Sequence, residues 1–205
     1  MQLRFETQLT STEYVTRQAW REATLARCPL HPREACGVSR HGTYSRVEPP
    51  GTRVVRFYCR SGKTTFSLLP DGLAARLSGS QDEVEQVVVA VEQAPSQEVA
   101  AAALRPDITL TAALRWVRRR LVPVRMTVLA LVTLMPGRLG SQARLASVRR
   151  ELGTDRALVA LRQIAGEHLA ALGPPVGFGP RPGVRRPKRR GLQQETGTDP
   201  PPALR

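Results

Sequence analysis

The most informative stretch of this sequence is Cys28-Pro-Leu-His31-Pro-Arg-Glu-Ala-Cys36-Gly37, and Cys59 follows it at the end of a β-prone run. A structural zinc site takes four sulfur or nitrogen ligands in a tetrahedron, supplied in pairs from two separated points of the chain. Cys28 and His31 have a C-x2-H spacing that can reach one ion, and the glycine after Cys36 lets backbone amides turn toward sulfur. The candidate metal ligands are therefore Cys28, His31, Cys36 and Cys59, with zinc as the cofactor.

Two residues leave alternatives open at this site. A regular zinc ribbon has a second cysteine three residues after Cys59, and Gly62 occupies that position, while His41 is near enough in the sequence to compete as a ligand. The alternative to a metal site is three reduced thiols in a metal-free β meander. All the cysteines and two of the three histidines nevertheless fall between residues 28 and 59, which favours the metal.

Short β-prone runs separated by turn residues surround the candidate ligands. The runs are Thr43–Val47, Arg53–Tyr58 and Thr64–Leu68, and they predict a three-stranded meander within a zinc-ribbon module of residues 28–72. Before this module, residues 1–27 contain a capping-box pattern at Thr10-x-x-Glu13 and predict a helix from Thr10 to Ala26.

The ribbon candidate lies in a longer pattern. It runs Cys28-Pro-x-His31…Cys36-Gly37…Arg40-His41-Gly-x-Tyr44-x-Arg46…Arg56-Phe-x-Cys59…Thr65-Phe66-Ser-Leu-Leu-Pro70. This pattern resembles the zinc-ribbon segment of bacterial proteins associated with transposases and insertion sequences. The resemblance implies a zinc ribbon followed by a helix-turn-helix and a role linked to transposition. The sequence departs from the pattern at His31 and at Gly62.

Residues 73–173 predict an all-α, helix-turn-helix-like region. The first predicted helix, Gln81–Gln93, carries valines on one face, and the second, Gln97–Leu104, follows after a Pro-Ser break. The third, Thr111–Leu121, continues past a kink at Pro123 to Met135. The second and third of these helices have the length and order of a helix-turn-helix.

The third of these helices carries the candidate DNA contacts. Leu114, Val117 and Leu121 should face the core, which places Arg115, Arg118 and Arg119 on the opposite side, toward phosphates or the major groove. Trp116 should pack under Arg120. The alternative is a solvated basic helix in a bundle.

The end of the chain divides into two further parts. Ser141–Leu152 and Thr154–Leu172 predict helices whose apolar residues form a bundle core or a self-association face. Residues 174–205 are rich in Pro, Gly and Arg and predict a disordered basic tail. The nucleic-acid-binding residues expected in this tail are Arg185, Arg186, Lys188, Arg189 and Arg190.

The charge of the chain indicates the class of its partner. The formal net charge is +14 and the pI is about 11.3, which favours polyanions. No catalytic constellation or phosphate loop is visible in the sequence, so we expect a non-catalytic DNA-binding protein, an accessory or remnant of a mobile element. The alternative is a zinc-ribbon protein-interaction module with incidental nucleic-acid affinity.

The remaining expectations concern partners and location. DNA is the expected partner, and a transposase or a second copy of the chain is the expected protein partner. We expect neither a small-molecule substrate nor an association with a membrane. The longest apolar run, Leu121–Met135, is interrupted by Pro123 and Arg125 and is too short for a bilayer span. With no apolar leader at the N-terminus, the expected location is cytoplasmic.

The complete expectation is therefore an α+β protein. It combines a small N-terminal zinc-ribbon β meander, an all-α helix-turn-helix-like region and a disordered basic tail.

Overall fold

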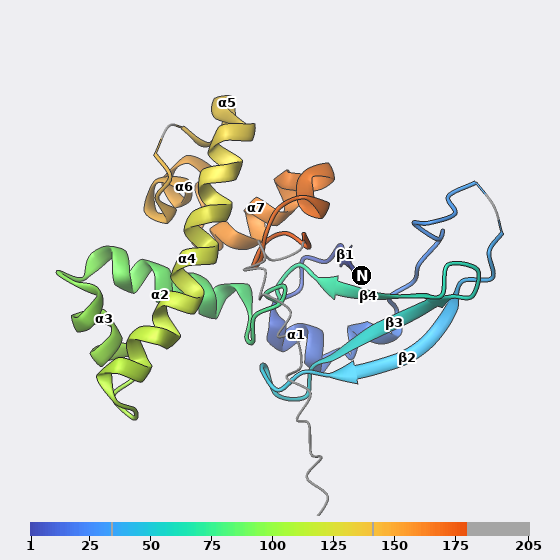
Figure 1. Ribbon diagram of the computed structural model, residues 1–205, viewed down its shortest axis with the longest axis horizontal. Coiled ribbons are helices and arrows are strands. Elements are labelled where there is room, and N and C mark those ends of the chain that lie inside the picture. The colour runs from blue at the N-terminus through green and yellow to red at the C-terminus, as the bar shows by residue number, and fades with distance from the viewer. Residues whose placement is uncertain (34, 141, 180–205) are drawn as a thin grey trace, which may run out of the picture.

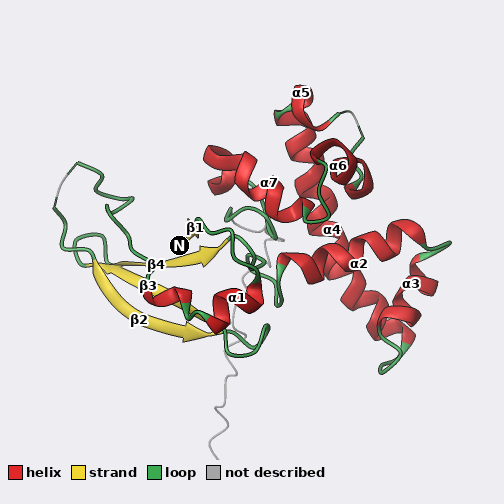
Figure 2. Ribbon diagram, turned by 180° about the vertical axis from the view of Figure 1, so that it is seen from behind, coloured by secondary structure: helices red, strands yellow, loops and turns green. Residues whose placement is uncertain are grey.

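A computed structural model describes residues 1–33, 35–140 and 142–179 and shows a mixed α+β protein with a four-stranded sheet. Figures 1 and 2 show helices α2–α7 gathered at one end of this sheet, while the loop that precedes β2 extends from the other end. Among the described residues, no helix is both long enough and apolar enough to cross a membrane.

The sheet has the strand order β1-β4-β3-β2. Strands β2 (Ser39–Ser45), β3 (Arg53–Cys59) and β4 (Thr64–Pro70) form the predicted antiparallel meander. Strand β1 (Gln2–Phe5) was not predicted and pairs in parallel with β4, with Gln2 beside Ser67. Four residues carry too weak a local pattern to reveal such a strand, because its formation depends on a partner far along the chain.

The N-terminal helix is much shorter than predicted. Helix α1 (Ser11–Thr16) has the expected capping box between Thr10 and Glu13, but Gln18 adopts a left-handed conformation with φ 52° and a 3-10 turn, η1 (Ala19–Arg21), follows. This turn buries Trp20 beside Tyr14, whose hydroxyl donates to the Arg53 carbonyl at 2.9 Å. Packing of these aromatic side chains therefore overrides the helical tendency of the sequence.

The two faces of the sheet pack against different parts of the chain. Val55, Phe57 and Cys59 pack with Ala23 and Cys28 from the N-terminal segment. On the other face, Val54 and Leu69 belong to the same hydrophobic core as the helices. The sheet therefore joins the N-terminal segment to the helical region.

The first helices closely follow the expected bounds. Helices α2 (Gln81–Gln93) and α3 (Gln97–Leu104) begin and end as predicted, and Val84, Val87, Val88 and Val91 of α2 are buried. Serine N-caps define both starts.

Helix α4 (Leu110–Leu134) begins after the cap residue Thr109 and continues through Pro123 as one helix. Proline removes the hydrogen bond to the carbonyl four residues earlier, here that of Arg119. Arg119 is nevertheless exposed, and the helix does not end at this position.

Three short helices and a 3-10 turn complete the helical region, and two of these helices, α6 and α7, take their N-terminal caps from α2. Helices α5 (Pro136–Leu139), α6 (Leu145–Leu152) and α7 (Ala157–Ala165) follow α4, and a 3-10 turn, η2 (Gly166–Ala170), ends the series.

The carboxylate of Glu92 accepts hydrogen bonds from the amides of Leu145 and Ala146, and buried Glu85 accepts from those of Ala157 and Leu158. Helices α6 and α7 have no side-chain caps of their own, and both begin later than the sequence predicts.

Residues 174–179 correct the predicted boundary of the disordered tail, because they are buried. Arg162 of α7 is 0% exposed, and its guanidinium donates to the carbonyls of Pro175 and Val176. It also donates to carbonyls at the end of β4 and just beyond, those of Pro70, Asp71 and Leu73. Burial lowers the pKa of Arg162 to about 9, so it remains charged at neutral pH.

Candidate functional site

The four predicted metal ligands come together at the end of the sheet remote from the helices. Cys59 ends β3, and Cys28, His31 and Cys36 belong to the loop between η1 and β2. Their ligand atoms all lie within 4.8 Å of one another, so these residues could bind a metal ion. Cys28 and Cys59 are buried, whereas His31 and Cys36 are partly exposed.

The spacing of the ligand atoms fits a tetrahedral ion. With Zn–S near 2.3 Å and Zn–N near 2.0 Å, tetrahedral angles place two sulfurs about 3.8 Å apart and a sulfur and a nitrogen about 3.5 Å apart. The Sγ atoms of Cys36 and Cys59 are 3.7 Å apart, and His31 Nδ1 lies 3.6 Å from Cys28 Sγ and 3.5 Å from Cys59 Sγ. These three separations match those of a tetrahedral ion, and all four ligand atoms lie within 4.8 Å of one another.

Backbone geometry holds the ligands in place. The amide of His31 donates to the Cys28 carbonyl at 3.1 Å, which closes a tight turn, and Gly37 has a φ of +66°. Gly62, at the position of a ribbon's missing cysteine, donates its amide to Cys59 Sγ at 3.2 Å. Gly62 thus orients a ligand through its backbone.

His41, the competing ligand, is exposed on β2 and is not part of the cluster. Its ring lies beside that of Tyr58, with centroids 5.5 Å apart.

The thiols affect one another's protonation. Desolvation raises the pKa of Cys28, but hydrogen bonds, chiefly from His31, outweigh it and lower that pKa to about 6. Desolvation and the neighbouring thiols Cys28 and Cys59 raise the pKa of Cys36 to about 11. The Cys28 thiolate is thus favoured over that of Cys36, and a bound cation would favour the thiolate form of both.

The predicted arginine face lies on the first half of α4. We use this name for Arg115, Arg118 and Arg119, which are all exposed, while Val117 and Leu121 on the other side of the helix are buried. The predicted opposition of the two faces is therefore present, although Leu114 is only partly buried. No Asp or Glu occurs in α4.

Trp116 packs beneath Arg120, as expected. The Arg120 guanidinium carbon lies 3.9 Å from the centroid of the indole, and Arg120 also donates to the Trp116 carbonyl. Arg105 approaches the same ring at 5.2 Å. The indole is thus engaged by two arginines of its own chain.

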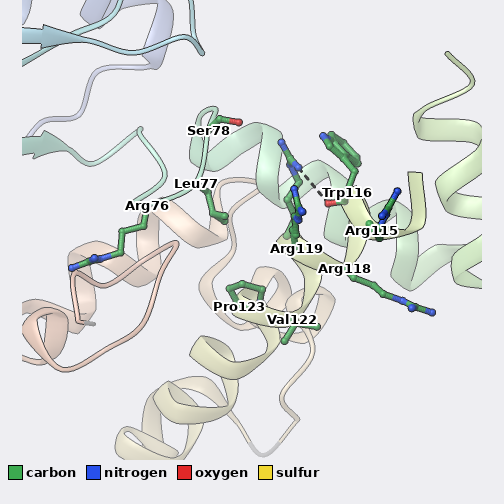
Figure 3. Close-up of a pocket in the computed structure, with 10 residues that line it drawn as sticks. Arg76, Leu77, Ser78, Arg115, Trp116, Arg118, Arg119, Val122 and Pro123 are labelled. Carbon is green, nitrogen blue, oxygen red and sulfur yellow. Dashed lines mark hydrogen bonds between the residues drawn. The ribbon is translucent and has the colours of Figure 1, made fainter. Parts of the chain in front are cut away.

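A cleft of about 1030 Å³ separates the loop at residues 76–78 from α4. Figure 3 shows Leu77 and Ser78 across from Arg119, whereas Arg118 points away from that loop. All three arginines of the arginine face line the cleft, and none of the described residues that line it is acidic. This surface therefore attracts anions.

The other expected nucleic-acid contacts lie beyond the described part of the chain. They are Arg185, Arg186, Lys188, Arg189 and Arg190. Helices α3 and α4 pack against each other, which is necessary for a helix-turn-helix but not specific to it.

Comparison with known proteins found no match among protein-family models, among curated proteins or among solved structures.

Proposed function

We propose that this chain is a non-catalytic protein that binds duplex DNA through the arginine face of α4 and holds one zinc ion between Cys28, His31, Cys36 and Cys59. The observation that carries the DNA proposal is the exposure of Arg115, Arg118 and Arg119 on a helix without acidic residues. Such side chains displace the cations that are condensed on DNA phosphates. Release of these counterions favours binding to any duplex.

The donor set supports zinc as the metal. Three thiolates and an imidazole are typical of structural zinc sites, and together they would fill all four positions of a tetrahedral ion, leaving no open position for a substrate. Zinc bound here would connect the loop of residues 28–36 to the end of β3, stabilising this part of the fold.

The link to mobile elements rests on the sequence pattern of residues 28–70. We propose an accessory or remnant of such an element, with a transposase or a second copy of the chain as its protein partner.

A protein-interaction module is the second candidate function. Val122, Met126 and Leu129 of α4 are 50–58% exposed and lie at helical spacing on one side, next to the arginine face. Exposed apolar side chains grouped in this way favour a protein partner.

Salt dependence distinguishes the two functions. We expect the chain to bind a duplex with an affinity that falls steeply between about 50 and 200 mM salt, and R118A/R119A to reduce the slope of log affinity against log salt by about 0.9 per lost phosphate contact. The matched control is R138A/R150A, which removes the same charge from exposed positions on α5 and α6. Equal slopes for the two double variants would remove α4 from the DNA-binding surface.

A further inference from the structure

The sheet has one open face near the metal ligands. Tyr58 and Arg56 point to the face opposite Val55 and Phe57, because side chains alternate along a strand. The face of Val55 and Phe57 is covered by the N-terminal segment. The helices cover the other face where Val54 joins their core, at the far end of β3 from Cys59.

Tyr58 is the aromatic side chain of this open face. Its cross-strand neighbours are Ser39 on β2 and Thr65 on β4, which are too small to cover its ring. The ring is half-buried and packs against none of the three hydrophobic clusters, and its aromatic neighbour is exposed His41. Part of Tyr58 therefore remains exposed to solvent beside His41.

Cations lie in the two loops at the end of the sheet that carries Tyr58. Arg60 and Lys63 are exposed in the turn between β3 and β4, where the Lys63 amide donates to the Arg60 carbonyl at 3.3 Å. Arg27 and Arg33 are exposed beside the metal ligands of the other loop. The described residues of these two loops, 26–33, 35–38 and 59–64, contain no Asp or Glu; Glu34 lies outside the described residues.

We propose that this face binds single-stranded nucleic acid, with a base stacked on Tyr58 and His41 and phosphates bound by Arg60 and Lys63. An aromatic ring on a sheet can stack only with a base that is free of its own helix, so a single strand fits this surface and a duplex does not. The metal ion would hold the loop with Arg27 and Arg33 beside the turn with Arg60 and Lys63. This inference does not rest on duplex binding by α4, which lies in the helical region.

The test compares oligonucleotides with and without bases. Fluorescence anisotropy of the zinc-loaded full-length chain is measured with oligothymidylate, oligouridylate and an abasic strand, each of about 12 nucleotides. We expect the better of the two base-containing strands to bind at least about fivefold more tightly than the abasic strand. The ratio of the thymidylate and uridylate affinities then assigns DNA or RNA.

Variants identify the ring and the cations. Tyr58→Leu should abolish the preference for bases, and Tyr58→Phe should retain it because the ring remains. Should Tyr58→Leu fail to fold, His41→Ala at an exposed position should still reduce the preference. R60A/K63A should lower the salt slope by about 0.7 per lost phosphate contact while leaving zinc content unchanged.

Two results would overturn the proposal. One is equal affinity for the abasic strand and both base-containing strands, which would reduce this face to a simple cationic surface. The other is a preference for bases that survives in Tyr58→Leu. R118A/R119A should retain the preference for bases. The proposal for this face can therefore hold even if α4 does not bind duplex DNA.

Discussion

The end of the sheet with the candidate metal ligands and the helical region differ in the contacts that their residues make. At the end of the sheet with the candidate metal ligands, four side chains from two separated parts of the chain converge within 4.8 Å, and the described residues of the loop between η1 and β2 form no helix or strand. The helical region has a continuous apolar core and buried charges paired with backbone groups. Local structure should therefore depend on the ion at one end and on packing at the other, and single substitutions can test this contrast.

The largest effect is expected from Cys36→Ser. Loss of one thiolate should eliminate the single zinc ion expected per chain and increase amide hydrogen exchange in residues 28–38 and 59–63. The helices should keep their protection, because none of them contributes a ligand. Zinc analysis with hydrogen-exchange mass spectrometry measures both; exchange that also rises throughout α2 and α7 would show that the two regions unfold together.

Arg162→Met should destabilise the fold around α7 while zinc binding is retained, which is the converse of the result expected for Cys36→Ser. Removal of Arg162 leaves five carbonyls around residues 70–73 and 175–176 without this donor in a buried site, and each unsatisfied group costs about 1–3 kcal/mol if water cannot replace it. The free energy of unfolding, measured with denaturant, should fall by about 3 kcal/mol or more, whereas zinc content should not change. A loss below about 1 kcal/mol would mean that water replaces the guanidinium.

Moving one ligand to position 62 tests the geometry of the cluster. A Cβ at position 62 would lie 3.5 Å from both Cys59 Sγ and His31 Cε1, and only the end of the partly exposed Leu30 side chain obstructs it. His31→Ala should lose zinc, and His31→Ala with Gly62→Cys should regain one zinc per chain. Failure of the double variant to bind zinc while its fold is retained would show that this turn cannot supply a ligand.

The smallest effect is expected from Glu92→Gln. A neutral amide keeps one acceptor oxygen for the two backbone amides at the start of α6 and loses the charge that favours a helix N-terminus, so stability should fall by about 0.5–1 kcal/mol. The melting temperature of this variant is compared with that of the control Glu151→Gln, which replaces an exposed glutamate in the last turn of α6. Equal melting temperatures would mean that the cap contributes nothing beyond solvation.

The sequence predicted those features that rest on local patterns. Helices α2 and α3 have serine caps followed by apolar residues at helical spacing, and their bounds were predicted correctly. The metal cluster was recognisable because cysteine and histidine are scarce elsewhere in the chain.

Features that depend on distant partners were not predictable. Strand β1 forms through pairing with β4, and α1 ends early because Trp20 packs beside Tyr14. Arg162 resembles any other helix arginine in the sequence, and nothing local shows that it is surrounded by carbonyls. The sequence does indicate that α6 and α7 need caps from elsewhere in the chain, because no serine, threonine, aspartate or asparagine immediately precedes their observed starts.

The two carboxylates of α2 restrict how the length of this helix can change in evolution. Glu85 and Glu92 are seven residues apart, close to two helical turns, so they project from nearly the same side. An insertion of one residue between them would rotate one carboxylate by about 100° relative to the other. One of the two recipient helices would then lose its cap. Substitutions on the exposed side of α2 should therefore accumulate among descendants of this sequence far more readily than insertions or deletions between the two glutamates.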